Sequence, residues 1–201
     1  MTAFIVLEGI DGSGKTTQSK SLLRRLRRRN IPALLTHEPG GTPLGEQLRR
    51  WLKGRPALSP LAELTLFIAA RAQLVEKVIN PALKSGVTVL SDRYTASTVA
   101  YQGHGRGLDL DLIGNLNSAA TGGLTPDMTI LFDMPPEESL ARRSNARVDT
   151  FEVAPWEFHR KVRESYLAQA AAHPDDWLVV DATQDKLRLS QQIWAKVEPL
   201  L

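Results

Sequence analysis

The run from Gly9 to Thr16 carries the clearest chemistry in the sequence, because it reads Gly-Ile-Asp-Gly-Ser-Gly-Lys-Thr. A glycine, four residues and then Gly-Lys-Thr is the spacing of a phosphate-binding P-loop. Glycines let backbone N–H groups approach a phosphate without a Cβ collision, and Lys15 can reach the β- and γ-phosphates. Thr16 offers a hydroxyl to Mg²⁺, and a helix that starts there directs its positive end at the anion. The run predicts a site for a magnesium-bound nucleoside triphosphate.

A second candidate site follows the apolar run Val87–Leu90, where Ser91, Asp92 and Arg93 come next. Ligands of a parallel α/β sheet bind beyond the carboxyl ends of its strands, so these side chains are expected to face the phosphates. Asp92 can hold Mg²⁺ or its water, and Arg93 can make a forked contact with a second phosphate. The alternative is that Asp92 caps the next helix and pairs with Arg93. Beside a P-loop, the functional interpretation is favoured.

Arg71 is the only charged residue in the apolar stretch 64–75, and Phe67 precedes it by one helical turn. A buried arginine is costly unless an acceptor meets it. That acceptor is either a structural carboxylate or the carbonyl of a nucleobase on which Phe67 stacks. Thr98 and Gln102 lie four residues apart and offer a hydroxyl and an amide, either to a base edge or as ordinary polar surface.

The segment Glu38-Pro39-Gly40-Gly41-Thr42 follows another apolar run. It is either a plain turn in which Thr42 caps the next helix, or part of the site at a second carboxyl end. Arg49 comes one to two turns into that helix and can point back toward the same cleft.

Five short apolar runs are the expected strands, and helical patterns separate them. They are Phe4–Leu7, Ala33–Thr36, Val87–Leu90, Thr129–Phe132 and Trp177–Val180. This alternation predicts a parallel sheet covered by helices on both faces. The length of 201 residues suits one domain spanning 1–201.

Two further segments carry expectations about the helices. A long helical run begins near Ser59, and Pro81 is expected to kink or end it. Residues 141–152 are polar and rich in arginine between two helical patterns, which is the composition of a short mobile lid.

The composition argues against several classes of protein. There is no cysteine, so disulfides and thiolate metal sites are excluded. The net charge is only +3, and the arginines within 24–29 fit a solvated helix end better than a nucleic-acid surface. No secretory signal or membrane span is apparent, so we expect a cytoplasmic protein with no nucleic-acid or membrane partner.

Taken together, these residues resemble the thymidylate kinase family. The matching segments run in family order across nearly the whole chain: Glu8–Gln18, Glu38–Thr42, Leu66–Arg71, Asp92–Tyr94, Ala100–Gly103, Pro126–Thr129 and Asp181–Thr183. The resemblance implies an α/β fold of the P-loop NTPase type. It also implies transfer of the γ-phosphoryl of ATP to dTMP with Mg²⁺ as cofactor, in a homodimer.

The resemblance also implies roles for individual residues. The ATP-binding set is Gly9, Ile10, Asp11, Gly12, Ser13, Gly14, Lys15, Thr16, Thr17, Arg143 and Thr183. The metal set is Thr16 and Asp92. The substrate-binding set is Asp11, Glu38, Arg49, Phe67, Arg71, Arg93, Thr98, Tyr101 and Gln102. The catalytic set is Lys15, Arg93, Arg147 and Asp11.

Within the substrate set, the resemblance implies a division of the nucleotide. Arg93 and Arg49 would grip the dTMP phosphate, and Asp11 would bond near the 3′-hydroxyl. Tyr101 would crowd the 2′ position. The base would lie on Phe67, with Arg71 donating to its 4-oxo group and Thr98 and Gln102 completing the edge.

Departures from the family pattern concern the catalytic arginine. Some members carry it within the P-loop, where this chain has Gly12 or Ser13. The resemblance is therefore to the subtype in which a lid arginine supplies the charge, with Arg147 the first candidate and Arg143 the second. Many bacterial relatives also have arginine at the positions of two other residues here, His37 and Thr150.

Two other functions fit part of the pattern. A deoxynucleoside kinase shares the P-loop and the Asp-Arg pair, but the extra arginines Arg49 and Arg93 favour a monophosphate as acceptor. A P-loop switch or nucleotide-binding module is the other alternative, although the guanine motif Asn-Lys-x-Asp is absent.

Overall fold

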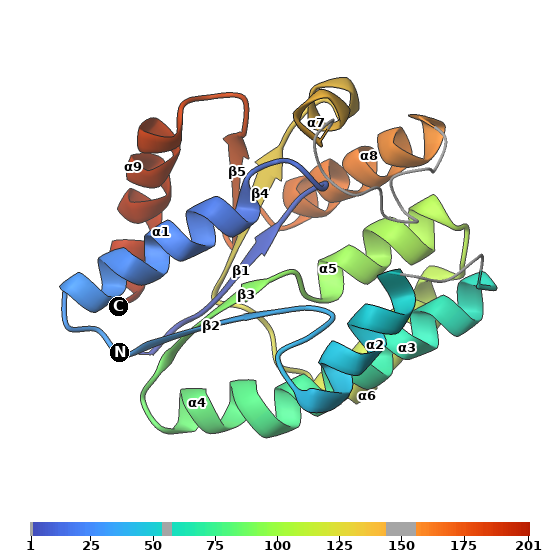
Figure 1. Ribbon diagram of the computed structural model, residues 1–201, viewed down its shortest axis with the longest axis horizontal. Coiled ribbons are helices and arrows are strands. Elements are labelled where there is room, and N and C mark those ends of the chain that lie inside the picture. The colour runs from blue at the N-terminus through green and yellow to red at the C-terminus, as the bar shows by residue number, and fades with distance from the viewer. Residues whose placement is uncertain (1, 54–57, 144–155) are drawn as a thin grey trace.

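The computed structural model describes residues 2–53, 58–143 and 156–201, and its centre is a parallel sheet (Figure 1). The strands lie in the order β2-β3-β1-β4-β5. They are β1 (Phe4–Glu8), β2 (Ala33–His37), β3 (Thr88–Asp92), β4 (Met128–Asp133) and β5 (Trp177–Asp181). Each overlaps the apolar run predicted for it and then continues to an ionisable residue. The parallel sheet is confirmed, and its carboxyl edge is charged.

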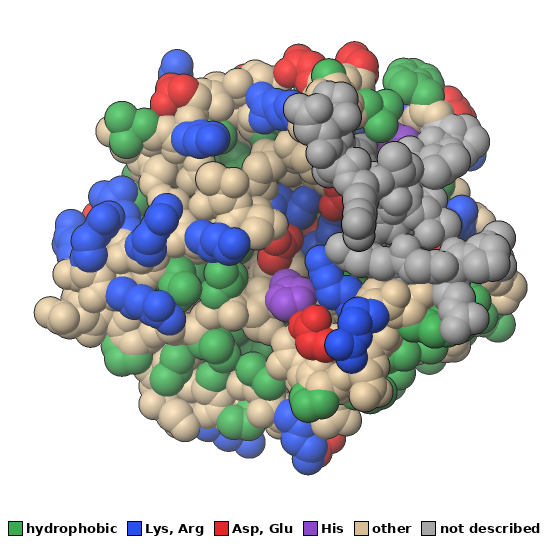
Figure 2. Space-filling model, in the orientation of Figure 1, with side chains coloured by type: hydrophobic (Ala, Val, Ile, Leu, Met, Phe, Trp, Pro, Cys, Tyr) green, Lys and Arg blue, Asp and Glu red, His purple; other side chains and the backbone are tan. Residues whose placement is uncertain are grey.

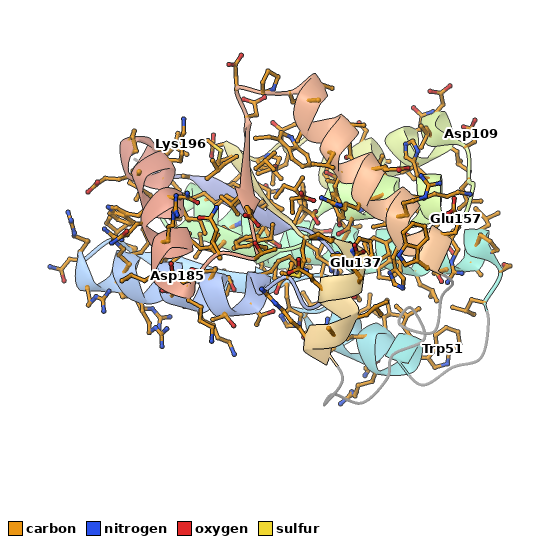
Figure 3. The ribbon with its side chains drawn as sticks, turned by 90° about the horizontal axis from the view of Figure 1, so that it is seen from above. Trp51, Asp109, Glu137, Glu157, Asp185 and Lys196 are labelled. Carbon is orange, nitrogen blue, oxygen red and sulfur yellow. The ribbon has the colours of Figure 1, made fainter. Side chains whose placement is uncertain are left out.

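The helices alternate with these strands along the chain. They are α1 (Lys15–Arg28), α2 (Pro43–Lys53), α3 (Pro60–Leu74), α4 (Asn80–Lys84), α5 (Thr95–Thr98), α6 (Leu110–Thr121), α7 (Pro136–Arg143), α8 (Trp156–Ala172) and α9 (Lys186–Val197). Asp109 and Asp185 lie at the starts of α6 and α9, where their side chains accept backbone N–H groups of the first turn (Figure 3). These caps satisfy donors that a helix leaves without partners.

The central strand β1 divides the core into two layers, because successive side chains of a strand point to opposite faces. Ile5 and Leu7 pack in a cluster with apolar residues of α1, α8 and α9. Phe4 and Val6 pack in a second cluster with residues at and after the end of α3. Helices therefore cover both faces, as predicted, and α1 and α9 lie side by side on one of them (Figure 1).

The long helical run begins as predicted, and its α-helical path is interrupted just before Pro81 but does not end there. Ser59 caps α3, and after Leu74 the chain passes through a π-helical turn, Val75–Ile79, into α4. Pro81 lies in the first turn of α4, a position that proline tolerates because its missing N–H has no helical partner there. A second π-helical segment, Val99–Gly105, follows α5.

The predicted lid, 141–152, falls mostly outside the described residues. Residues 141–143 form the end of α7, and α8 begins at Trp156. In the part of the chain that the structure describes, no helix is both long enough and apolar enough to cross a membrane.

Candidate active site

A cleft with a volume of about 690 Å³ opens at the carboxyl edge of the sheet. Acidic and basic side chains meet in the hollow on this face (Figure 2). The cleft is lined by Asp11, Gly12, Gly14, Lys15, Thr16, Thr17, Ser19, Lys20, Leu35, Thr36, His37, Glu38, Arg49, Asp92 and Arg93. The P-loop, the turn after β2 and the end of β3 thus contribute to one space, as the parallel topology predicts.

The P-loop joins β1 to α1 and depends on glycine at two points. At Gly9, with φ of 136°, a Cβ atom would come within 2.6 Å of the Phe132 carbonyl oxygen. Gly14 has a left-handed backbone, φ 92°, and immediately precedes Lys15 at the start of α1. The loop can therefore turn tightly and still present the N-terminus of α1 to the cleft.

Lys15 is folded back onto the loop that carries it. Its Nζ donates to the carbonyl oxygens of Gly9 and Ile10 at 2.8 and 2.9 Å. Burial, together with the nearby charge of Arg93, lowers the pKa of Lys15 to about 8. A cation that has lost its hydration is stabilised by an incoming polyanion, so the site suits a phosphate chain.

The two residues predicted to serve Mg²⁺ are in contact. Thr16 Oγ1 donates to Asp92 Oδ2 at 2.7 Å. A hydroxyl and a carboxylate are hard oxygen ligands of the kind Mg²⁺ takes when phosphates and water complete its shell. Among the described residues there is no cluster of three or more His, Cys, Asp or Glu that could hold a metal alone. The alternative for Asp92 is wrong, because α5 has no side-chain cap and Arg93 pairs elsewhere.

Arg93 lies at the end of β3 in a left-handed backbone conformation, with φ of 77°. Its Nη2 donates to Asp11 Oδ1 at 2.6 Å and to the Tyr101 hydroxyl at 3.1 Å. Its Nη1 donates to the hydroxyls of Ser97 and Tyr166, both at 3.1 Å. Burial opposes its charge, but the surrounding hydroxyl and carboxylate oxygens hold the pKa of Arg93 well above its usual value.

Arg71 is buried, with 1% of its surface exposed, and its acceptors all come from the protein. Its Nε and Nη2 both reach Glu38 Oε2, at 2.8 and 2.7 Å. Nη1 donates to Thr98 Oγ1 at 2.9 Å and to Asn117 Oδ1 at 2.5 Å. Nη2 also donates to the backbone oxygen of Tyr94 at 2.9 Å. The structural carboxylate left open by the sequence is therefore present, and it is Glu38.

Glu38 faces both Arg71 and the cleft. Burial raises the pKa of Glu38, while the charge and hydrogen bonds of Arg71 act in the opposite direction. Its second oxygen, Oε1, is buried without a hydrogen-bond partner. A ligand donor in the cleft would satisfy it, which agrees with the substrate-binding role predicted for Glu38.

The remaining base-edge candidates are buried and not ordinary polar surface. Gln102 is 2% exposed and its Nε2 donates to Glu63 Oε1 at 2.8 Å. Thr98 is 1% exposed and accepts from Arg71. Phe67 is half-buried on α3, one turn before Arg71. Of the three, Thr98 contacts Arg71, and none of them lines the cleft described above.

The turn after β2 serves as both a cap and a part of the site. Thr42 Oγ1 accepts from the Gly45 N–H at 3.0 Å, as expected of a helix cap. Arg49 lines the cleft, as predicted, and donates to the Pro39 oxygen at 3.2 Å. His37 lies at the same mouth, 3.0 Å from Glu46 Oε1.

The two residues predicted to bind ATP outside the P-loop, Arg143 and Thr183, are only partly described. Thr183 Oγ1 donates to Asp181 Oδ1 at 2.6 Å, in the turn after β5. Arg142 on α7 donates to the Ala182 oxygen of that turn at 3.0 Å. Arg143 ends α7, but its side chain and the whole of Arg147 lie outside the described residues.

Sequence reasoning missed Glu8, Ser97, Asn117 and Tyr166 as parts of the site. Each bonds an arginine of the site or a partner of that arginine. Glu8 carried a signal, since it is a charged residue that ends a buried strand. The other three have the appearance of ordinary polar or core residues of helices.

Comparisons with known proteins agree with this geometry. A family model described as Thymidylate kinase matches residues 7–193. A thymidylate kinase of Synechococcus sp. (strain JA-2-3B'a(2-13)) is 50% identical over 198 residues, covering 98% of this chain and 95% of that one. One of Thermomicrobium roseum is 49% identical, covering 100% and 97%. The crystal structure of thymidylate kinase from Ehrlichia chaffeensis superposes with a TM-score of 0.80 at 36% identity and covers 98% of both chains.

Proposed function

The chain belongs to the thymidylate kinase family, and we propose how its residues divide the work of that family's reaction. The enzyme transfers the γ-phosphoryl group of ATP to dTMP and releases dTDP and ADP, a step toward dTTP for DNA synthesis. Of the three functions considered, the monophosphate kinase is therefore supported over a deoxynucleoside kinase and over a P-loop switch.

The observation that carries the proposed division is that cations from two sides line one cleft. Lys15 comes from the P-loop at the start of α1, Arg49 comes from α2, and Arg93 follows the end of β3. Phosphoryl transfer requires in-line positioning and neutralisation of charge more than covalent help. The acceptor oxygen of dTMP is already anionic, so no general base is needed.

On the donor side, Lys15 and the backbone N–H groups of the Gly9–Thr17 loop bind the ATP phosphates. Lys15 leaves the carbonyl oxygens that it now contacts and turns to the β- and γ-phosphates. Thr16 and Asp92 would hold Mg²⁺, which when bound with ATP neutralises charge on the phosphate oxygens. Thr183 and Arg143 contribute to the adenine end.

On the acceptor side, Arg93 and Arg49 bind the dTMP phosphate, and Asp11 exchanges its contact with Arg93 for one with the sugar. Tyr101 lies beside Arg93 and restricts the 2′ position. The thymine base lies over Phe67, where Glu38, Arg71, Thr98 and Gln102 offer polar groups to its edge. Because Arg71 is saturated by protein acceptors, the base must share or replace one of them.

A lid arginine neutralises the remaining negative charge on the transferring phosphoryl group, and Arg147 is the first candidate for this role. An arginine in this role contributes about 10³–10⁵ in rate. We expect Arg147→Ala to lower kcat far more than it weakens ATP or dTMP binding, as measured by steady-state kinetics. A change of less than about tenfold in kcat would exclude Arg147 and leave Arg143 to test.

An assay of ADP release with different acceptors tests the base pocket. The missing methyl of dUMP is worth about 1–3 kcal/mol, so dUMP should be a poor but measurable substrate. In dCMP an amino group faces the donor Arg71, and such a mismatch can cost roughly 10⁴-fold. Thymidine, which lacks the phosphate, should not be phosphorylated. Comparable rates for dTMP and dCMP would overturn the Arg71 pocket.

The family resemblance also leads us to propose a homodimer. The exposed leucines Leu61 of α3 and Leu110 and Leu112 of α6 give these two contacting helices an apolar outer surface. Sedimentation at micromolar concentration checks the assembly, and a monomer would contradict it.

A further inference from the structure

Glu8 is the last residue of β1 and is buried beneath the P-loop. Its Oε1 accepts the backbone N–H groups of Tyr94 and Ser97, at 2.8 and 3.2 Å. Its Oε2 accepts the Ser97 hydroxyl at 2.7 Å and the Tyr166 hydroxyl at 2.9 Å. Burial raises the pKa of Glu8, and the charge of Arg93 and these hydrogen bonds oppose that effect. Backbone N–H groups can only donate, so the site is arranged for an accepting carboxylate.

The same two hydroxyls contact Arg93 on their other side. Ser97 Oγ and the Tyr166 hydroxyl each accept from Arg93 Nη1 at 3.1 Å. A hydroxyl has one proton to donate and lone pairs with which to accept, so each can link the guanidinium to the Glu8 carboxylate. Arg93 is thus joined to a buried negative charge without touching it.

The other terminal nitrogen of Arg93 has a different environment. Nη2 pairs with Asp11 at 2.6 Å, and 45% of the Asp11 side chain is exposed. Both Asp11 and Arg93 line the cleft. A half-exposed carboxylate can move aside at little cost, whereas the buried Glu8 cannot. Nη1 of Arg93 therefore meets the hydroxyls of Ser97 and Tyr166, whereas Nη2 meets the buried Tyr101 hydroxyl and the exchangeable Asp11.

We propose that Glu8 is a positioning residue for Arg93 and acts through the hydroxyls of Ser97 and Tyr166. The inner nitrogen stays bound when the dTMP phosphate replaces Asp11 at the outer one. The left-handed backbone of Arg93 agrees with this, because a non-glycine residue keeps that conformation only where its surroundings hold it. The inference rests on the proposed contact between Arg93 and the dTMP phosphate.

Removal of the linking hydroxyls tests the proposal in the full-length enzyme. Ser97→Ala and Tyr166→Phe should each lower kcat/KM for dTMP by about tenfold, since each removes a hydrogen bond to a charged group. The loss should appear mainly as a higher KM for dTMP, with the KM for ATP changed by less than about twofold. Tyr94→Phe is the matched control, because Tyr94 is equally buried and its hydroxyl donates to the Leu124 oxygen.

A double-mutant cycle separates positioning from a structural role. In the Arg93→Lys background, Ser97→Ala and Tyr166→Phe should each cost less than about twofold, because the group they position is gone. The proposal would be overturned if either variant still lowered kcat/KM for dTMP by about tenfold in the Arg93→Lys background. It would also be overturned if Tyr94→Phe lowered kcat/KM for dTMP in the otherwise unchanged enzyme as much as Ser97→Ala and Tyr166→Phe do. If Arg93→Lys itself leaves kcat/KM for dTMP unchanged, that result contradicts the proposed contact between Arg93 and the dTMP phosphate, on which the role of Glu8 depends. Glu8→Gln tests the role of the negative charge of Glu8 directly. If the Glu8→Gln protein does not fold, Ser97→Ala and Tyr166→Phe still test the proposal.

Discussion

The surroundings of Arg71 and Arg93 differ, although both arginines lie near the carboxyl edge of the sheet with most of their surface covered. Arg71 finds acceptors for its donors in Glu38, Thr98, Asn117 and a backbone oxygen. Nη1 of Arg93 meets the hydroxyls of Ser97 and Tyr166, while Nη2 meets the Tyr101 hydroxyl and the half-exposed Asp11.

The difference separates two uses of a buried cation. A guanidinium whose partners are all buried holds elements together, here α3, the turn after β2, and α6. A guanidinium with one exchangeable partner is ready to bind an anion. Burial alone therefore does not distinguish the two arginines, whereas the exposure of the carboxylate that each one pairs with does.

The largest predicted effect is the loss of activity when the Arg93 side chain is removed, and it tests the contrast between the two arginines directly. We expect Arg93→Ala to lower kcat/KM for dTMP by about 10³-fold, because truncating a buried partner of a charge costs several kcal/mol. Steady-state assays with dTMP varied at saturating ATP measure it. The free energy of unfolding should change less than in Arg71→Ala, because Asp11 can turn to water and Glu8 keeps its four hydrogen-bond donors. Near-normal kcat/KM would mean that Arg93 is not a phosphate ligand.

The next effect concerns the stability that Arg71 provides. We expect Arg71→Ala to reduce the free energy of unfolding by about 3–5 kcal/mol, because Glu38 is left buried and unpaired. Urea unfolding measures the change. The control is Arg160→Ala, whose exposed ion pairs on α8 are worth about 0–1 kcal/mol. If Arg71→Ala and Arg160→Ala reduced the free energy of unfolding equally, the buried ion pair of Arg71 would contribute no more to stability than the exposed ion pairs of Arg160.

The smallest predicted effect is the uptake of a proton by Lys15 when ATP binds. The pKa of Lys15 lies below its ordinary value of 10.5, at about 8, so the ligand-free protein loses this proton as the pH rises through that value. Phosphates favour the charged form, so ATP binding at about pH 9 should take up close to one proton, and at about pH 7 almost none from this group. Calorimetry in buffers of different ionisation enthalpy measures it. Lys15→Arg is the control, and equal uptake by that variant would exclude Lys15 as the source.

The P-loop and the sheet could be predicted because their signals are local. The Gly9–Thr16 spacing and the five apolar runs each lie within a few neighbouring residues, and the strands appear where expected. The place of Asp92 and Arg93 at the cleft could be predicted for a related reason, since the end of a parallel strand has a known place in such a fold. The same reasoning applies to Glu38 after β2.

The network around Arg93 could not be predicted in this way. Glu8 and Tyr166 are 158 positions apart in the chain, yet their side chains are in contact. The α8 helix that carries Tyr166 has an ordinary apolar pattern, and a buried tyrosine in such a helix is typical of a core. The two π-helical segments were not predicted either, since the sequence indicated only a kink or an end of the helical run at Pro81.

The sequence by itself determined the phosphate-binding loop, the order of strands and helices, and the family, because each depends on neighbouring residues and their spacing. Only the tertiary structure decided which carboxylate meets which arginine. Ion pairing depends on distances of a few ångströms and on burial, and both are set by the packing of segments far apart in the chain. That packing gave Arg71 a buried partner in Glu38 and gave Arg93 an exchangeable one in Asp11.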